Sequence, residues 1–98
     1  MTRWSIPAGI EPALRLWMER RLWSAPGGKE FTADLFADWV AWIDKTTLVK
    51  PADKAGLKCI KRRAWSNWLG QLMPKEVRYR SDGRSAWRGI ILRERERR

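Results

Sequence analysis

The sequence predicts a small, mainly helical domain that ends in a C-terminal β-hairpin. A chain of 98 residues allows one modest hydrophobic core. Apolar residues recur at helical spacing in three segments between positions 10 and 73. Asp82 and Gly83 then separate two runs of residues with good strand propensity, which is a strong hairpin signal. We therefore expect an N-terminal arm at 1–9, one folded domain at 10–92 and a charged tail at 93–98.

The first helix is predicted from about residue 11 to 22. Its apolar positions are Ile10, Ala13, Leu14 and Trp17. Pro12 falls in the first turn, where a missing amide donor is tolerated, and Arg20 and Arg21 suit the C-terminus of a helix. The stretch SAPGGKE is expected to form an ordinary turn at residues 24–28, because its two glycines do not match the phosphate-loop pattern.

The second helix is predicted from about residue 33 to 45. Thr32 can cap its N-terminus, and Phe31 can pack onto Phe36. Its apolar face is formed by Leu35, Phe36, Trp39, Val40 and Ile43. Residues 46–56 are either a loop or a short helical turn after Pro51, because Gly56 would weaken a helix there.

The segment IKRRAWSNWLGQLMP predicts the helix with the strongest functional signal. Its apolar stripe is formed by Trp65, Trp68, Leu69, Leu72 and Met73. The opposite face has no acidic residue and presents Arg62, Arg63, Ser66, Asn67 and Gly70, with Gln71 at its edge. Arginine and lysine suit guanine edges and phosphates, and amides suit adenine, so this face matches a helix in a major groove. A solvated helix face without a specific role is the alternative interpretation.

The segment VRYRSDGRSAWRGIIL predicts a two-stranded hairpin whose turn is centred on Asp82 and Gly83. This turn predicts the cross-strand pairs Tyr79 with Ala86, Arg78 with Trp87, and Val77 with Arg88. Strict alternation then assigns an inward side to Val77, Tyr79, Ala86, Ile90 and Leu92. The outer side is assigned to Arg78, Arg80 and Trp87, with Arg84 at the tip. A slip of one residue would reverse the two sides.

Charge points to an acidic partner. Lys and Arg number 21 against 11 Asp and Glu, which gives a formal net charge of +10. Residues 1–60 contribute 9 bases and 7 acids, whereas residues 61–98 contribute 12 bases and 4 acids. Such a charge attracts polyanions before any specific contact forms. The binding surface is therefore expected in the C-terminal part of the chain.

The composition argues against catalysis. The chain has no histidine, and its cysteine and carboxylate spacing matches no metal site, so we expect no metal, no cofactor and no enzymatic activity. Cys59 is the single cysteine, and its apolar neighbours predict a buried thiol in a reducing cytoplasm. No apolar run approaches the roughly 20 residues of a membrane span, and the N-terminus lacks a signal-peptide pattern. A soluble cytoplasmic protein is expected.

The order of these segments resembles the winged helix-turn-helix plan, in which a basic helix and the hairpin after it contact one stretch of duplex. The stretches FTADLFADWVAWI, KRRAWSNWLGQL and RYRSDGRSAWRGIIL resemble the small winged-helix module at the C-terminus of poxvirus-type primase-helicases of phages and plasmids. The resemblance covers residues 30–92. It implies DNA binding beside a replication enzyme, carried by Arg62, Arg63, Asn67, Arg78, Arg80 and Arg84. This chain lacks an attached helicase, so a free-standing accessory protein, a repressor or excision factor, and an excised domain all remain open.

The expected function is binding of nucleic acid, most simply double-stranded DNA, as an accessory replication or regulatory factor of a phage or mobile element. The expected contact residues are Lys61, Arg62, Arg63, Ser66, Asn67, Gln71, Arg78, Arg80, Arg84, Trp87 and Arg88. The alternative is a mobile-element protein that binds and inhibits a host protein, such as a nuclease, through the same basic face. Among the eight tryptophans, we expect Trp17, Trp39, Trp65 and Trp68 in the core, Trp87 outside it, and leave Trp4, Trp23 and Trp42 undecided.

Overall fold

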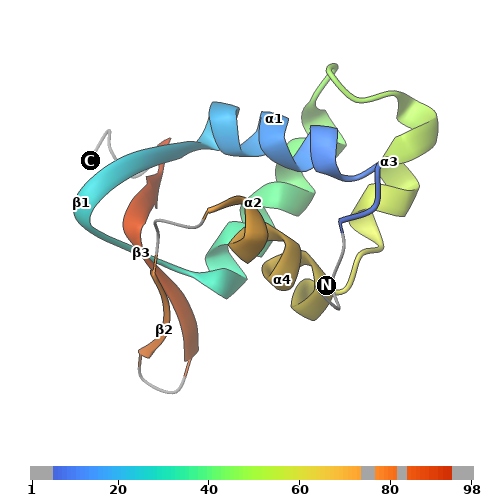
Figure 1. The fold of residues 1–98 in the computed structure, drawn as a ribbon. Helices are drawn as coiled ribbons and strands as arrows, with labels where there is room; N and C mark the ends of the chain where they lie inside the picture. The colour runs from blue at the N-terminus through green and yellow to red at the C-terminus, as the bar shows by residue number, and fades with distance from the viewer. Residues whose placement is uncertain (1–5, 74–76, 82–83, 94–98) are drawn as a thin grey trace.

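The computed structural model describes residues 6–73, 77–81 and 84–93, with residues 77–81 and 84 described by their backbone. Within these ranges the chain forms four helices and three strands (Figure 1). Their order is α1 (Glu11–Arg21), β1 (Leu22–Phe31), α2 (Thr32–Lys45), α3 (Pro51–Lys58), α4 (Arg62–Leu72), β2 (Val77–Ser81) and β3 (Arg84–Leu92). The prediction of a mainly helical domain with a C-terminal hairpin is confirmed. None of the helices in these ranges is long and apolar enough to cross a membrane.

The sheet contains a strand that the sequence analysis missed. Its order is β1-β3-β2, so β3 lies in the middle and pairs with both neighbours in antiparallel fashion. Residues 24–28 were predicted as an ordinary turn, but they lie inside β1. The register moves from Ser24 opposite Ile90 to Lys29 opposite Arg88, so residues 25–28 bulge out opposite Gly89 alone. The turn-forming residues therefore form a large bulge within the edge strand β1.

Two glycines allow the backbone to form this bulge. Gly27 has a φ of 82°, which an L side chain rarely adopts. A Cβ on Gly28 would lie 2.8 Å from Ile91 Cγ2 and 2.9 Å from the Ala25 carbonyl oxygen, so a side chain does not fit there. The pair thus serves backbone conformation and close packing rather than binding of a phosphate.

The register of the β2–β3 hairpin is the one that the sequence predicted. The observed pairs include Val77 with Arg88, Arg78 with Trp87, and Tyr79 with Ala86. Because the Asp82-Gly83 signal fixes both the position and the length of the turn, it also fixes the pairing on either side.

The outward placement of Trp87 was wrong. Its ring is 1% exposed, and its Nε1 donates a hydrogen bond of 2.9 Å to Thr32 Oγ1 at the start of α2. Gly89, with a φ of 86°, interrupts the strict alternation of sides along β3. Trp87 and Ile90 can therefore both contribute to the core, although they are three positions apart and strict alternation would place them on opposite sides. Thr32 also differs from expectation, because Phe31 is the N-cap residue of α2.

Replacing Gly89 with alanine should destabilise the fold by about 1–2 kcal/mol, the ordinary cost of a left-handed conformation for an L residue. Urea unfolding followed by circular dichroism measures this change. Gly9, where a Cβ would meet nothing within 4 Å and φ is not positive, provides the control substitution to alanine. Equal stability of the two variants would contradict the role given to Gly89.

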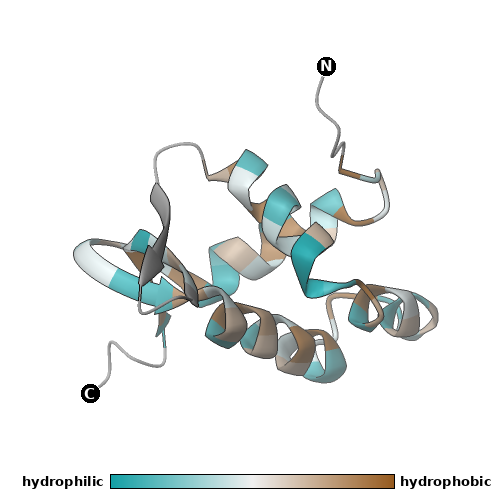
Figure 2. Ribbon diagram, turned by 90° about the horizontal axis from the view of Figure 1, so that it is seen from below, coloured by the Kyte–Doolittle hydropathy of each residue, from teal (hydrophilic) through white to brown (hydrophobic). Residues whose placement is uncertain are grey.

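The core is built around tryptophan rings from three helices. Trp17 of α1, Trp39 of α2 and Trp65 of α4 are all fully buried. Their ring centroids lie 6.0 Å (Trp17 to Trp39), 5.4 Å (Trp17 to Trp65) and 6.2 Å (Trp39 to Trp65) apart. The helices are amphipathic, with hydrophilic and hydrophobic positions alternating along the ribbon (Figure 2). The core positions predicted for these three tryptophans are confirmed, whereas Trp68 is only half-buried.

A polar contact joins α1 to α2 at the edge of this core. Asp38 accepts hydrogen bonds from Trp17 Nε1 at 2.9 Å and from Arg21 Nε at 3.0 Å on its Oδ2 atom. Its Oδ1 atom accepts a third from Arg21 Nη2 at 2.6 Å. A two-pronged arginine–carboxylate contact fixes geometry as well as charge. This contact orients α1 on α2.

The segment after α2 contains α3, so the alternative with a helical turn after Pro51 is the correct one. Cys59 was predicted as a buried thiol, but it is exposed. Its neighbour Leu57 occupies the buried position, and the Leu57 carbonyl oxygen accepts a hydrogen bond of 3.4 Å from Trp39 Nε1. On a short helix, apolar neighbours in sequence point to different sides, so they do not bury the residue between them.

Candidate nucleic-acid interface

Helix α4 packs on the core through Trp65, Leu69 and Met73, all of which are buried. Lys61 is its N-cap residue, and the helix contains no acidic side chain. Figure 1 shows α4 and the β2–β3 hairpin on the lower side of the molecule, with α1 on the upper side. The core thus determines which side of α4 remains open to a partner.

Three polar residues follow one another along the open side of α4. Arg63, Asn67 and Gln71 are spaced four residues apart, which places them in one row along a helix. Arg63 and Gln71 are exposed, and Asn67 is half-buried. Lys61 and Arg62 are exposed at the N-terminal end of the same helix. The structure therefore brings together five of the predicted contact residues.

Ser66 does not belong to this surface. It was predicted on the polar face, but it is 2% exposed. Gly70, one turn further along the helix, was also expected to face a ligand. A Cβ on Gly70 would instead lie 3.4 Å from Trp87 Cη2 of the hairpin. Because Ser66 is buried and the Trp87 ring lies against Gly70, we exclude both residues from this surface.

The buried side of α4 is therefore rotated relative to the prediction. The sequence pattern predicted a stripe that included Trp65, Trp68 and Leu69 and placed Ser66 on the opposite face. In the structure the buried side is centred between Trp65 and Ser66, and Trp68 lies at its margin. A ring supplied by a distant strand thus shifts the boundary between core and surface by about one helix position.

The hairpin contributes a second set of predicted residues. Arg78 lies opposite Trp87, Arg80 opposite Ser85, and Arg84 opposite Ser81. The side chains of Arg78, Arg80 and Arg84 lie outside the described part of the structure, so their contact with nucleic acid stays a prediction. Arg88 is exposed and lies opposite Val77 on one neighbouring strand and Lys29 on the other.

Lys29 is a cation that sequence reasoning did not place at the site. It is exposed on β1 directly opposite Arg88, and its Nζ lies 5.1 Å from the centroid of the Phe31 ring. Two cationic residues therefore lie directly opposite each other at this point of the sheet. The pairing could not be predicted, because strand β1 itself was not recognised.

The lysines of α3 have a structural role. Lys58 Nζ lies 2.9 Å from Asp44 Oδ1, and Lys54 Nζ donates a hydrogen bond of 3.1 Å to the Asp44 carbonyl oxygen. The hydrogen bond and charge of Lys58 hold the pKa of Asp44 below its usual value. A lowered carboxyl pKa means that this link stabilises the fold above the unfolded-state pKa and is lost as the pH falls through the folded-state pKa.

The resulting surface combines cationic and amide side chains on an acid-free helix beside a hairpin with a high content of arginine. Cations bind phosphate oxygens, and amides bind base edges through paired donors and acceptors. Among the residues that the structure describes, no group of three or more His, Cys, Asp or Glu side chains could hold a metal ion. Comparison of the chain with protein-family models, curated proteins and solved structures found no match.

Proposed function

We propose that this protein is a non-catalytic winged helix-turn-helix protein that binds duplex DNA with α4 and the β2–β3 hairpin. The observation that carries the proposal is the row Arg63, Asn67 and Gln71 on the open side of an acid-free helix. In such a helix the arginine contacts phosphate or guanine and the two amides read base edges. The formal net charge of +10 supports the same partner.

The topology supports the winged-helix interpretation. A recognition helix followed directly by a hairpin lets both elements contact one duplex, and here α4 leads directly to β2 and β3. Strand β1 completes the sheet by pairing with β3, which anchors the hairpin to the helical core. In chain order, helix α3 stands between α2 and α4. The simplest helix-turn-helix has only a short turn between its two helices, so α3 is an addition to that plan.

Burial of Trp87 gives the hairpin a defined position relative to α4. The indole contacts Gly70 on α4 and donates to Thr32 on α2, so the hairpin base is attached to both helices. If the angle between the helix and the hairpin is fixed beforehand, both can contact a duplex without the entropy cost of ordering them on binding. We therefore assign Trp87 a positioning role and exclude it from the proposed contact residues.

The biological setting follows from the resemblance to the winged-helix modules of primase-helicases. It is an accessory or regulatory role in the replication of a phage or mobile element. In that setting the phosphate contacts of Arg62, Arg63, Lys29 and Arg88 would hold the protein on any duplex. The amides of Asn67 and Gln71 would select the site.

Replacing Arg62 and Arg63 together with alanine should weaken binding to every duplex and leave the fold intact, because both side chains are exposed. Each lost phosphate contact should flatten the slope of log affinity against log salt by roughly 0.9. Fluorescence anisotropy at several salt concentrations measures both effects. The double variant Lys45→Ala, Lys50→Ala is the control, because it removes the same charge from exposed positions outside α4. Equal weakening in both variants would show that only net charge matters.

Replacing Asn67 with alanine should have a different signature. Loss of one amide that reads a base should cost about 1–3 kcal/mol on the preferred site. Affinity for random duplex and the salt slope should stay close to those of the parent. The preferred site is first obtained by selection from a randomised duplex pool, and affinities are then compared on that site and on random sequence. No change on any sequence would remove Asn67 from the reading surface and favour a protein partner for this face.

A further inference from the structure

Trp23 is an exposed aromatic residue on β1 that belongs neither to α4 nor to the β2–β3 hairpin. It is 41% exposed and lies on β1 opposite Ile91. Strand β3 runs from Arg84, at the hairpin, to Leu92, so Ile91 and Trp23 lie at the opposite end of the sheet from the hairpin tip. Neither α4 nor the hairpin uses this ring.

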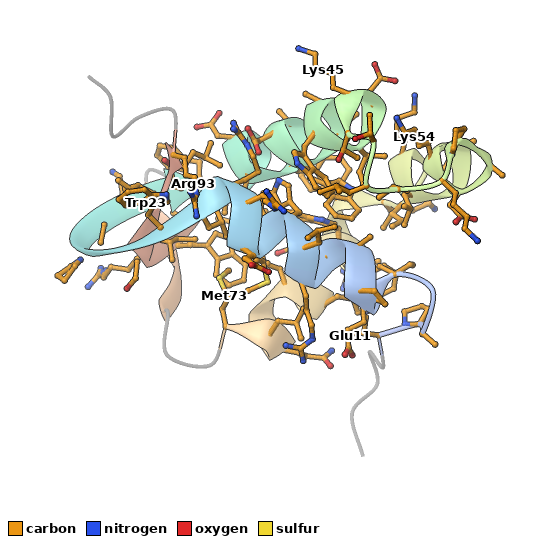
Figure 3. The ribbon with its side chains drawn as sticks, turned by 90° about the horizontal axis from the view of Figure 1, so that it is seen from above. Glu11, Trp23, Lys45, Lys54, Met73 and Arg93 are labelled. Atoms are coloured by element: carbon orange, nitrogen blue, oxygen red, sulfur yellow. The ribbon has the colours of Figure 1, made fainter. Side chains whose placement is uncertain are left out.

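Arg93 holds its guanidinium group against the Trp23 ring. The Arg93 Cζ atom lies 5.1 Å from the ring centroid, and Figure 3 shows the two side chains beside each other. The Arg93 Nη2 atom also donates a hydrogen bond of 2.8 Å to the Glu19 carbonyl oxygen in the last turn of α1. A cation over an indole face is an attractive contact, and the hydrogen bond to the helix end limits its movement. The pair is thus oriented before any ligand binds.

Among the residues that the structure describes, those close to Trp23 in the chain are mostly polar and only moderately basic. Ser24, Pro26 and Gly27, which follow Trp23 on β1, are exposed, and Arg20 is exposed in the last turn of α1. Glu19 is exposed on the same turn and offsets part of the positive charge. A ligand bound here would therefore gain more from contact with the ring than from neutralisation of phosphates.

Within the described part of the chain, the exposed Trp23 ring does not belong to a larger exposed apolar patch, which argues against a protein partner. Among the described residues, Trp23 and Leu48 are the large hydrophobic side chains that are exposed. Leu48 lies in the connection between α2 and α3, on a different part of the molecule (Figure 1). A large contiguous apolar patch marks a protein interface, whereas a single exposed ring beside an arginine can serve as a platform for a stacked base.

We propose that Trp23 and Arg93 form a stacking site for an unpaired base of single-stranded nucleic acid. The base stacks on the indole, and the guanidinium of Arg93 contributes a cation contact and a hydrogen-bond donor to the adjoining phosphate. The proposal does not depend on duplex binding by α4. A protein with both surfaces can contact a duplex and an unpaired strand that extends from it.

The test measures binding of a fluorescein-labelled ten-nucleotide oligothymidylate to the full chain by anisotropy. Stacking of one base is worth about 1–3 kcal/mol, so Trp23→Ala should weaken this affinity roughly 5- to 150-fold. Trp23→Phe keeps an aromatic face and should restore most of the affinity. Leu48→Ala, which removes the other exposed large hydrophobic side chain, should bind like the parent. Duplex affinity of Trp23→Ala should also match the parent, which separates this test from that of α4.

A crosslinking measurement gives an independent readout that does not require a variant to fold. An oligonucleotide with one 5-iodouracil is irradiated in complex with the parent protein, and the crosslinked peptide is identified by mass spectrometry. Crosslinking at Trp23 supports the proposal. Absence of oligothymidylate binding by the parent, equal affinity of Trp23→Ala and the parent, or crosslinking confined to α4 and the hairpin would each overturn it.

Discussion

Replacing Trp65 with alanine is expected to lower the free energy of unfolding by about 3–5 kcal/mol, which is a large part of the total stability of a small domain. Its ring is fully buried at the meeting point of α1, α2 and α4. The ring centroid lies 5.4 Å from that of Trp17 and 5.3 Å from that of Phe36. Truncation removes these contacts and leaves a cavity that three helices cannot close without moving.

Urea unfolding of the variant, followed by far-ultraviolet circular dichroism, measures this loss. Trp68→Ala, three residues further along the same helix, should cost less because Trp68 is only half-buried. Leu48→Ala, at a side chain that is 53% exposed, should stay within about 0.5 kcal/mol of the parent. A larger loss for Trp68→Ala than for Trp65→Ala would contradict the observed rotation of α4.

Replacing Trp87 with alanine is expected to have an effect of similar size, about 3–5 kcal/mol, and also to weaken duplex binding. The ring fills the space above Gly70, with Cη2 at 3.4 Å from the position of a Cβ there. Its Nε1 hydrogen bond to Thr32 Oγ1, at 2.9 Å, is buried. Loss of the ring removes the contact that sets the angle between the hairpin and α4.

Two matched variants separate the contributions of Trp87. Trp87→Phe keeps most of the apolar contact but breaks the hydrogen bond, so it should cost clearly less than alanine. Thr32→Val removes the acceptor and should cost about 1–3 kcal/mol, because it leaves the buried indole donor without that partner. Thermal melts and duplex anisotropy are measured for all three. If Trp87→Ala melts like the parent but loses DNA, then Trp87 is a direct contact residue and its assigned positioning role is wrong.

The helices were predictable because the information that specifies them is local. The helix signals are Pro12, the spacing of apolar residues in α1 and α2, and the basic start of α4, and each lies within the segment that it defines. The predicted range 33–45 agrees with α2 to within one residue at its start. The hairpin register was also predictable, because Asp82 and Gly83 determine it from within the turn.

Side-chain placement in the hairpin was less predictable. Strict alternation assigned Trp87 to the outside, and a positive φ at Gly89 made that assignment wrong. A glycine within a strand pattern often marks a bulge, so Gly89 indicated in the sequence that the alternation of sides could be interrupted there. Its effect on the sides of β3 still depended on which strand would pair there, and that strand was β1.

Part of the candidate surface was predictable from the sequence, and part was not. Arg63, Asn67 and Gln71 were identified from the polar face of one helix; in the structure Arg63 and Gln71 are exposed and Asn67 is half-buried. Ser66 was assigned to the same face by its polarity, yet it is buried. The hydropathy of a side chain indicates whether it favours burial or solvent. Whether it is actually buried depends on which other element packs against it.

From the sequence alone we predicted α1, α2 and α4, the hairpin register, the excess of positive charge and the acid-free polar face of α4, whereas α3 was left open. Only the tertiary structure decided that residues 22–31 form a strand, that Trp87 packs against Gly70, and that Trp23 remains exposed beside Arg93. The features predicted from the sequence depend on residues that are close together in the chain, and the spacing of apolar and turn-forming residues indicates them directly. The features that only the tertiary structure decided depend on pairs such as Glu30 and Leu92, which are hydrogen-bonded across a sequence separation of 62 residues. No local pattern encodes such a pair, because its free energy is gained only when the whole fold brings the two strands together.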